Sequence, residues 1–353
     1  MTEDHGHRRK AVTDFVLALL AVQSGCQAQL ARFFDNQESA LKRLSRFLHN
    51  PRFGVETFVL AHAAQLVARL PRSGFIRVAI DWTSEATQHM LVVSLIVGRR
   101  AVPLLWKAYD QAQLKDHTHE YEREMLTLLI TTVLKGVERG RILITADRGF
   151  GDVETVDLLE GLSVAFIIRA KGNVKVEVDG TWRKLHTLRF RTNQRRRAWG
   201  RLLYCERSPR RLWLTHARER DRSGRWGIWF LITNRRFRAD TATREYARRF
   251  GCEEGFKDAK RMLGFADTRI KDIRAWERMF TLVAIALVVL VHIGGALLKN
   301  RAWLEDLLRR VRSRRRTRSE LSLVRAVTEL LDKDTALWDL LDHRAKLNLE
   351  AAL

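Results

Sequence analysis

The stretch that decides the fold is GFIRVAID, residues 74–81, together with HMLVVSLIVGRRAVPLLWKAY, residues 89–109. Both are dominated by β-branched and other large apolar side chains, which favour extended strands. Gly98-Arg99-Arg100 interrupts the second run and predicts a turn between two long strands. The sequence therefore predicts three consecutive strands, the first of which ends in an acid, Asp81.

Helix and strand patterns alternate beyond this stretch. A long helical segment has Thr118 as a suitable N-cap and Gly140 at its end, and a strand, a second helix and a last strand follow it. The order β-β-β-α-β-α-β is characteristic of an α/β fold in which a ribonuclease H-like mixed sheet has helices on its faces. The four later segments are THEYEREMLTLLITTVLKGVERG (118–140), RILITAD (141–147), VETVDLLEGL (153–162) and VAFIIRA (164–170).

The charge of the chain indicates a polyanionic partner. Its 353 residues include 64 Lys and Arg against 41 Asp and Glu, a formal net charge of +23. A field of this sign attracts polyanions, of which nucleic acid is the commonest, and arginine suits bidentate contacts with phosphate. A solvated basic surface or an Arg-biased composition is the alternative interpretation.

Three regions flank or interrupt the core, which we place at residues 71–300. Residues 171–236 hold short apolar runs between basic turns, with a hairpin signal at Asp179-Gly180, and predict a β-rich insertion. Residues 1–70 contain three amphipathic helical patterns with cations on one face, which we expect to form a DNA-binding region. Residues 301–353 are Arg-rich and helical, and we expect them to contribute to oligomerisation.

Other features bear on location. Cys26, Cys205 and Cys252 lie far apart without a CxxC pair, so no zinc site or disulfide framework is indicated and a cytoplasmic protein is favoured. The first ten residues are polar and unlike a signal peptide. Met279–Lys299 approaches the length of a membrane span, but it contains His292 and a Gly-Gly pair and directly follows a charged amphipathic helix. We predict a buried core helix there and no membrane contact, with a membrane span as the alternative.

Acidic residues stand among cations in YARRFGCEEGFKDAK, residues 246–260. The surrounding sequence predicts one helix over residues 240–264, with an aspartate as its N-cap and a glycine at its end. At about 100° per residue, a phenol, two cations and one carboxylate fall within roughly 60° on one face: Tyr246, Arg249, Glu253 and Lys260. Glu254 points elsewhere. A solvated face with i,i+4 ion pairs is the simplest interpretation of such a stripe.

Two other acids argue against that interpretation. Asp81 and Asp147 each close a hydrophobic strand, where an unpaired buried carboxylate is costly, although either alone could be an N-cap or turn residue. Ligands of open α/β sheets bind at the carboxyl ends of strands. Two aspartates there, with a glutamate from a later helix, offer oxygen ligands to hard divalent cations. Two such ions about 3.5–4 Å apart can activate an attacking oxygen and stabilise a leaving one in phosphoryl transfer.

The spacing Tyr246-x2-Arg249-x3-Glu253-x6-Lys260 resembles the signature of bacterial insertion-sequence transposases of the IS-four family, a DDE class. AIDWT, residues 79–83, resembles the first Asp strand of that family. ADRGFGD, residues 146–152, resembles the second, with Arg148 after the Asp as expected. The resemblance covers Gly74 to Lys299. Phe250 and Cys252 replace the Trp and Ile common around the Glu, and we interpret Cys252 as a packing residue rather than a nucleophile.

The resemblance implies a ribonuclease H-like fold with Asp81, Asp147 and Glu253 as the Mg²⁺-binding catalytic triad, for which Mn²⁺ would substitute. It also implies a β-strand insertion between the second Asp and the Glu. DNA-binding roles carry over to residues that would contact the backbone near the transposon end: Tyr246, Arg249, Lys260 and Arg148. In related members a Trp of the insertion stabilises a flipped base. WFLIT makes Trp229 the candidate, with Trp226 and a purely structural Trp229 left open.

The expected function is that of a DNA transposase. It would bind the terminal inverted repeats of its element as a homodimer, cleave the double-stranded DNA at the ends, and join the 3′-hydroxyl to target DNA, directly or after a hairpin. The expected location is the bacterial nucleoid. Two other classes remain open: a metal-dependent nuclease of the same fold that lacks strand transfer, and a non-catalytic DNA-binding protein derived from a transposase.

Overall fold

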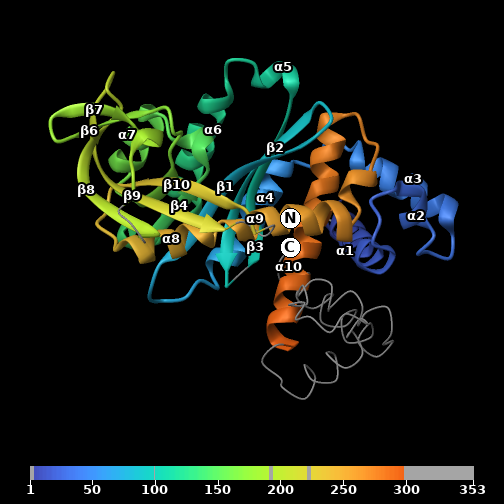
Figure 1. The fold of residues 1–353 in the computed structure, drawn as a ribbon. Helices are drawn as coiled ribbons and strands as arrows, with labels where there is room; N and C mark the ends of the chain where they lie inside the picture. Colours follow the sequence, from blue (N-terminus) through green and yellow to red (C-terminus); the bar gives the residue numbers. More distant parts are fainter. Residues whose placement is uncertain (1–3, 99, 191–193, 221–223, 298–353) are drawn as a thin grey trace.

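The fold is a single mixed sheet with helices on both faces (Figure 1). The structure is a computed structural model that describes residues 4–98, 100–190, 194–220 and 224–297. The predicted C-terminal region, 301–353, lies outside the described residues. The ten strands of the sheet are β1 (Ile76–Glu85), β2 (Gln88–Val97), β3 (Arg100–Asp110), β4 (Ile142–Ala146), β5 (Ala165–Arg169), β6 (Lys175–Val178), β7 (Thr181–Lys184), β8 (Arg196–Tyr204), β9 (Arg210–Arg220) and β10 (Trp226–Thr233).

The first five strands confirm the predicted ribonuclease H-like order. They lie in the sheet as β3-β2-β1-β4-β5. The first three strands are antiparallel neighbours, and β4 and β5 are parallel to β1. Between them come α5 (Gln111–Leu114), α6 (Thr118–Leu128) and α7 (Val153–Gly161). The long helix predicted over 118–140 is shorter, because its last turn widens into a π-helical segment at Leu129–Val133.

The predicted end of the first strand at Asp81 is wrong. β1 continues to Glu85, because Trp82–Glu85 keep their antiparallel pairing with β2. On the other side, the parallel pairing of β1 with β4 ends at Ile80 and Ala146. Asp81 therefore lies in the middle of a strand, but just beyond the point where its neighbour β4 stops.

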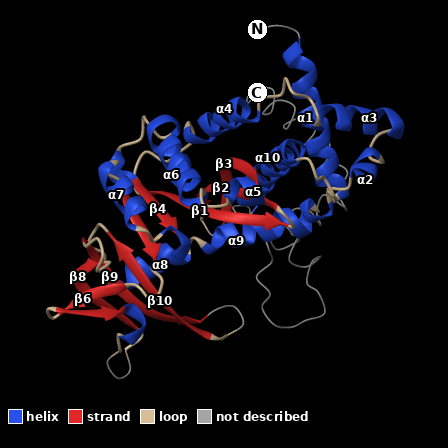
Figure 2. Ribbon diagram, turned by 90° about the horizontal axis from the view of Figure 1, so that it is seen from above, coloured by secondary structure: helices blue, strands red, loops and turns tan. Residues whose placement is uncertain are grey.

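The β-rich insertion continues the same sheet. β10 pairs antiparallel with β5 through Leu231 opposite Arg169 and Ile232 opposite Ile168. The order then runs β10-β9-β8-β6-β7, and a reversal with Asp179 and Gly180 at positive φ joins β6 to β7 as predicted. Both views place the strands of the insertion at one end of the molecule and the helices of residues 4–48 at the other (Figures 1 and 2).

Side chains along β1 alternate between two apolar layers. Val78 and Ile80 belong to the main core, which also includes residues of α6 and α7. Ala79 faces the other way and packs with Cys252 of α9 (Phe250–Lys257). A further cluster on that second face joins β4, β5 and β10 to α8 (Ala239–Ala247). Figure 2 shows α6 and α7 on one side of β1 and β4, and α8 and α9 on the other.

The N-terminal helices pack on the core rather than standing apart from it. They are α1 (Asp4–Val22), α2 (Gln27–Ala31), α3 (Gln37–Leu48) and α4 (Val55–Val67). α1 and α3 contact α10 (Ile273–Leu297), and α4 contacts β3. Their apolar residues share the main core with the sheet. The short α2 was not expected from the sequence.

α10 is the apolar segment that raised the question of a membrane span. Among the described residues, its part Ile273–Gly294 is the one helix long and apolar enough to cross a membrane. However, 72% of its apolar window is buried inside the protein. Phe280 of α10 packs edge-on against Trp106 of β3, with ring centroids 5.8 Å apart. These contacts are those of the core helix that we predicted.

The single helix predicted over 240–264 is divided. α8 ends at Ala247 and α9 begins at Phe250. Between them the backbone tightens, because the N–H groups of Arg249 and Cys252 bond to the carbonyls three residues earlier. After α9 the backbone widens into a π-helical segment, Asp258–Met262, which carries Lys260. The angular positions expected for a regular helix therefore do not hold across the segment.

The insertion contains a buried histidine, His216. His216 is 1% exposed and stacks between Phe190 and Phe230, with ring centroids 3.7 and 4.8 Å away. Within the described part of the chain neither ring nitrogen has a hydrogen-bond partner. Burial, together with the nearby Arg197 charge, lowers the pKa of His216 from 6.5 to about 4.

We expect the free energy of unfolding to fall by up to about 3 kcal/mol as the pH drops from 6.5 to about 4. The sign follows from the lowered pKa of His216, because the unfolded chain takes up the proton first. Urea unfolding across this range should show the loss in the wild type but not in His216→Leu. The exposed His186→Leu is the control. An identical pH profile for His216→Leu and the wild type would contradict the assignment.

Candidate active site

The register of the sheet brings the two aspartates together. Ile80 of β1 pairs with Ala146 of β4 in parallel, so the next residues, Asp81 and Asp147, are neighbours at the point where β4 ends. Asp81 shares the α9 side of β1 with Ala79. Its Oδ1 accepts a hydrogen bond of 3.0 Å from the backbone N–H of Trp82. This places two carboxylates side by side at the carboxyl end of β4, one on β1 and one directly after β4.

Arg249 joins the glutamate of α9 to the first aspartate. Its two terminal nitrogens donate to Asp81 Oδ2 at 2.6 Å and to Glu253 Oε1 at 2.8 Å. The Arg249 side chain is 4% exposed, whereas that of Glu253 is 50% exposed. The two carboxylates therefore converge on one buried guanidinium, and Glu253 faces the solvent side of the site.

Tyr246 holds the second aspartate. The phenol is fully buried and its hydroxyl donates to Asp147 Oδ1 at 3.2 Å. Arg169, the last residue of β5, lies 4.0 Å from the same oxygen. The guanidinium of Arg249 also lies over the ring of Tyr246, 5.6 Å from its centroid. A phenol and two guanidiniums therefore surround the three acids.

Burial and charge act in opposite directions on these groups. Burial raises the pKa of Asp81, and the Arg249 charge offsets part of the rise. Burial also raises the pKa of Tyr246, which keeps the phenol protonated and able to donate. Burial opposes the charge of Arg249, but the surrounding Tyr246 and carboxylates outweigh it and raise its pKa. The site is thus a cluster of anions compensated by the buried guanidinium of Arg249, with the more exposed Arg169 beside Asp147.

The other DNA-binding residues expected from the sequence lie around this cluster. Arg148 is exposed directly after Asp147. Lys260 donates to the backbone carbonyl of Ser84 at 2.5 Å and lies 3.6 Å from Glu85, at the end of β1. The ring of Trp229 lies 5.2 Å from that of Tyr246 and 5.6 Å from that of Phe250.

Small residues allow α9 to approach the sheet closely. A Cβ at Gly255 would lie 3.4 Å from the carbonyl oxygen of Ala101, in van der Waals contact with the backbone of β3. Cys252 is 1% exposed between Ala79 and Ala101. Burial raises the pKa of the Cys252 thiol to about 12, so it is a packing residue and not a thiolate. This close approach is what brings Glu253 to the edge of β1.

The residues of the site suit a hard divalent cation. All three acids offer carboxylate oxygens, the ligands that Mg²⁺ and Mn²⁺ prefer. Asp81 Oδ2 and Glu253 Oε1 already converge on a positive charge, that of Arg249.

A second group of ligand-type side chains lies on the opposite face of the sheet. His119, Glu122 and Asp152 have ligand atoms within 4.8 Å of one another. This second group shares no residue with the acids around Arg249.

Comparison with known proteins adds the family. Residues 114–289 match the protein family described as "Transposase DDE domain". The similarity to a transposase DDE domain thus runs from the end of α5 into α10. A comparison with curated proteins finds no match. The matched residues of the transposase domain include Asp147 and Glu253, and Asp81 lies upstream of them on β1 of the same sheet.

A basic surface lies on the insertion of this protein. Trp226 is 40% exposed, and the guanidiniums of Arg218 and Arg220 lie 4.9 and 4.7 Å from its ring centroid. These residues, with Arg195, line a hollow of about 360 Å³. Trp229 and Leu231 belong to the α8 side of β10, so Trp226 faces the opposite side by strand alternation. The two tryptophans therefore belong to different surfaces.

Two parts of the site were not expected from the sequence. Arg169 is the last residue of β5, and a cation at the carboxyl end of a strand next to one that is followed by an acid is a signal that could have indicated it. The role of Arg249 as a bridge between two acids was also missed, because helical spacing shows only that Arg249 and Glu253 share a face. Its reach to Asp81, 168 residues earlier, depends on the fold.

Proposed function

We propose that the chain is a DNA transposase of the IS-four type. It binds the terminal inverted repeats of an insertion sequence, cleaves at the element ends and transfers the 3′-hydroxyl to target DNA, directly or through a hairpin. The observation that carries the proposal is the convergence of Asp81, Asp147 and Glu253 around Arg249 at one edge of the sheet. The match of residues 114–289 to a transposase DDE domain supports assigning these acids to DNA cleavage and joining.

Each side chain then has a distinct part in the reaction. Asp81 and Asp147 would hold Mg²⁺ from the sheet, and Glu253 would complete the site from α9. Bound there, two such ions would activate the attacking oxygen and neutralise charge at the phosphate. Arg148, exposed beside Asp147, is placed to contact the DNA backbone. Tyr246 orients Asp147. Arg249 compensates the negative charge of the three acids until a phosphate of the DNA approaches.

Charge and shape support the DNA partner. The net charge of +23 favours a long polyanion. We propose that residues 1–70 and the basic surface around Trp226 bind duplex DNA outside the catalytic edge, and that Trp229, on the catalytic side, faces a base displaced at the cut. Assembly as a homodimer on paired ends, and a place in the bacterial cytoplasm at the nucleoid, belong to the same proposal.

Strand joining tests the function. The protein is incubated with Mg²⁺ and a DNA whose end sequence comes from the DNA flanking its gene, supplied either intact or pre-cleaved with a free 3′-hydroxyl. A transposase joins the pre-cleaved end to a plasmid target. Cleavage of the intact DNA without joining would instead identify a nuclease of the same fold, and binding without either reaction would identify a non-catalytic DNA-binding protein.

Replacing each of the two tryptophans by alanine separates a role in DNA binding from a role in packing. We expect Trp226→Ala to weaken binding of end DNA by about tenfold without changing thermal stability, because an exposed ring among arginines stacks on or packs against nucleic acid. Trp229→Ala should lower the free energy of unfolding by about 2 kcal/mol, because its ring packs on Tyr246 and Phe250. Fluorescence anisotropy and urea unfolding measure the two effects. Equal DNA affinity of Trp226→Ala and the wild type would contradict this assignment.

A further inference from the structure

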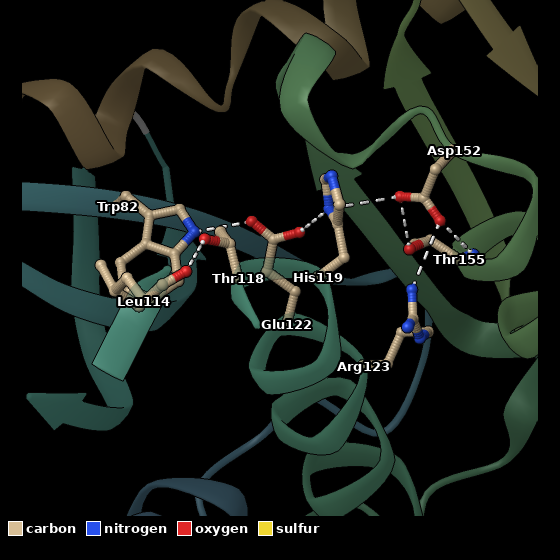
Figure 3. Close-up of polar contacts among 8 residues, drawn as sticks. All are labelled: Trp82, Leu114, Thr118, His119, Glu122, Arg123, Asp152 and Thr155. Carbon is tan, nitrogen blue, oxygen red and sulfur yellow. Dashed lines mark hydrogen bonds and ion pairs between the residues drawn. The ribbon is translucent and has the colours of Figure 1, made fainter. Parts of the chain in front are cut away.

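A chain of polar contacts lies behind the catalytic aspartates, on the face of the sheet away from α9 (Figure 3). It begins at Trp82, whose backbone N–H donates to Asp81 Oδ1 and whose side chain points to the opposite face. The indole N–H donates to Glu122 Oε1 on α6 at 2.6 Å. One residue thus links the first aspartate to a carboxylate on the other side of the sheet.

The chain continues to the segment that follows the second aspartate. Glu122 Oε2 is 2.8 Å from His119 Nδ1, and that nitrogen lies 3.6 Å from Asp152 Oδ2. Asp152 stands five residues after Asp147 and caps α7 by accepting bonds of 2.8 Å from the backbone N–H and the hydroxyl of Thr155. The network therefore reaches from β1 to the turn after β4.

Burial makes the middle of the network costly to leave unpaired. Glu122 is 2% exposed, in a helix whose neighbouring side chains Met125 and Leu126 belong to the main core. A buried carboxylate without partners is strongly unfavourable. Glu122 has two partners: it accepts a hydrogen bond from the indole of Trp82 and is paired with the imidazole of His119. Both of its oxygens are used.

We propose that Glu122 and His119 are positioning residues of the transposase: they tie Trp82 to Asp152 and thereby fix the separation of Asp81 and Asp147. The inference rests on the proposed function of those aspartates. A metal ion in this second cluster is the competing interpretation. It is less favoured, because the carboxylate oxygens of Glu122 and Asp152 already accept hydrogen bonds from protein donors.

The test measures Mn²⁺ binding to the full-length protein by electron paramagnetic resonance, and in parallel the Mn²⁺ concentration that gives half-maximal cleavage of end DNA. We expect Glu122→Leu and Trp82→Phe each to weaken Mn²⁺ binding about tenfold, the lower end of the effect of outer-layer partners of metal ligands. Binding of end DNA in EDTA should not change. Glu122→Gln, which keeps an acceptor for the indole, should have a smaller effect.

The chain provides a matched control on the same helix. His117 Nδ1 and Glu120 Oε2 form a pair of the same i,i+3 spacing at 2.9 Å, but both side chains are 59% exposed. Glu120→Leu should bind Mn²⁺ as the wild type does. The double variant Trp82→Phe/Glu122→Leu should bind Mn²⁺ no more weakly than the more affected single variant. Both changes break the same hydrogen bond, from the indole to Glu122.

Three results would overturn the proposal. The first is wild-type Mn²⁺ affinity in Trp82→Phe, which keeps an aromatic ring but removes the indole N–H and carries the test even if Glu122→Leu does not fold. The second is an equal loss in Glu120→Leu. The third is stoichiometric Zn²⁺ binding that His119→Ala abolishes, which would make the cluster a metal site. If the wild type binds Mn²⁺ through Asp147 but does not cleave DNA, the proposed function is refuted. The positioning role is still tested in that case, because it is measured by the Mn²⁺ affinity of the variants.

Discussion

Asp147→Asn is expected to lower Mg²⁺-dependent cleavage of end DNA by at least about a thousandfold, since loss of outer-layer partners alone costs metal sites about 10–100-fold. The variant keeps the shape of the side chain and an oxygen that can accept from the Tyr246 hydroxyl. The fold and the binding of end DNA should therefore persist. Gel assays of cleavage, with anisotropy for binding, measure the two properties on the same preparations.

The control for this variant is Asp157→Asn. Asp157 is an acid of α7 that is 44% exposed and paired with Arg210 on the insertion, away from the catalytic edge. Its loss should leave cleavage unchanged. Cleavage by Asp147→Asn at the wild-type rate would show that the carboxylate takes no part in the reaction, and the assignment of the catalytic edge would then be wrong.

Arg249→Ala is expected to destabilise the metal-free protein by about 2–3 kcal/mol. Breaking a fully buried ion pair costs about 3–5 kcal/mol, and the value here is smaller because Glu253 is half exposed and can be solvated. Without the guanidinium, Asp81, Asp147 and Glu253 repel one another. A divalent cation supplies the missing charge, so Mn²⁺ should restore most of the lost stability and should stabilise the variant more than the wild type.

Urea unfolding with and without Mn²⁺ measures this effect, and Arg77→Ala is the matched control. Arg77 lies on β1 and pairs with Glu245 of α8 on the same face of the sheet, but outside the cluster of acids. Its removal should destabilise the protein by an amount that Mn²⁺ does not restore. An equal Mn²⁺ effect in Arg249→Ala and the wild type would mean that Arg249 and the ion do not share a site.

The fold followed from the sequence because its main signal is local. Apolar runs such as those of β4 and β5, separated by amphipathic helices, leave few alternatives for the order of the core strands. The end of β1 was misplaced because Trp82–Glu85 are largely polar, and they are extended only through pairing with β2. The division of the helix at Arg249 was missed since helix propensity alone gives no reason for a break there.

The candidate site was predictable in its acids but not in its contacts. The acid that closes each apolar run located Asp81 and Asp147, although β1 continues past Asp81, and the resemblance to a family signature located Glu253. Spacing cannot show that Tyr246 is buried or that its hydroxyl meets Asp147, because this contact spans 99 residues. The Trp82–Glu122 bond has no sequence signal either, since it joins a strand to a helix 40 residues later.

The continuous sheet has a consequence for dissecting the molecule. β5 is hydrogen-bonded on one side to β4 and on the other to β10, so strands of the insertion complete the interior of the sheet. Excising residues 171–236 would turn an apolar central strand into a bare edge, and such edges recruit other chains. A trimmed fragment of this kind should therefore self-associate, because the insertion, besides its proposed contact with DNA, covers an edge of the core sheet.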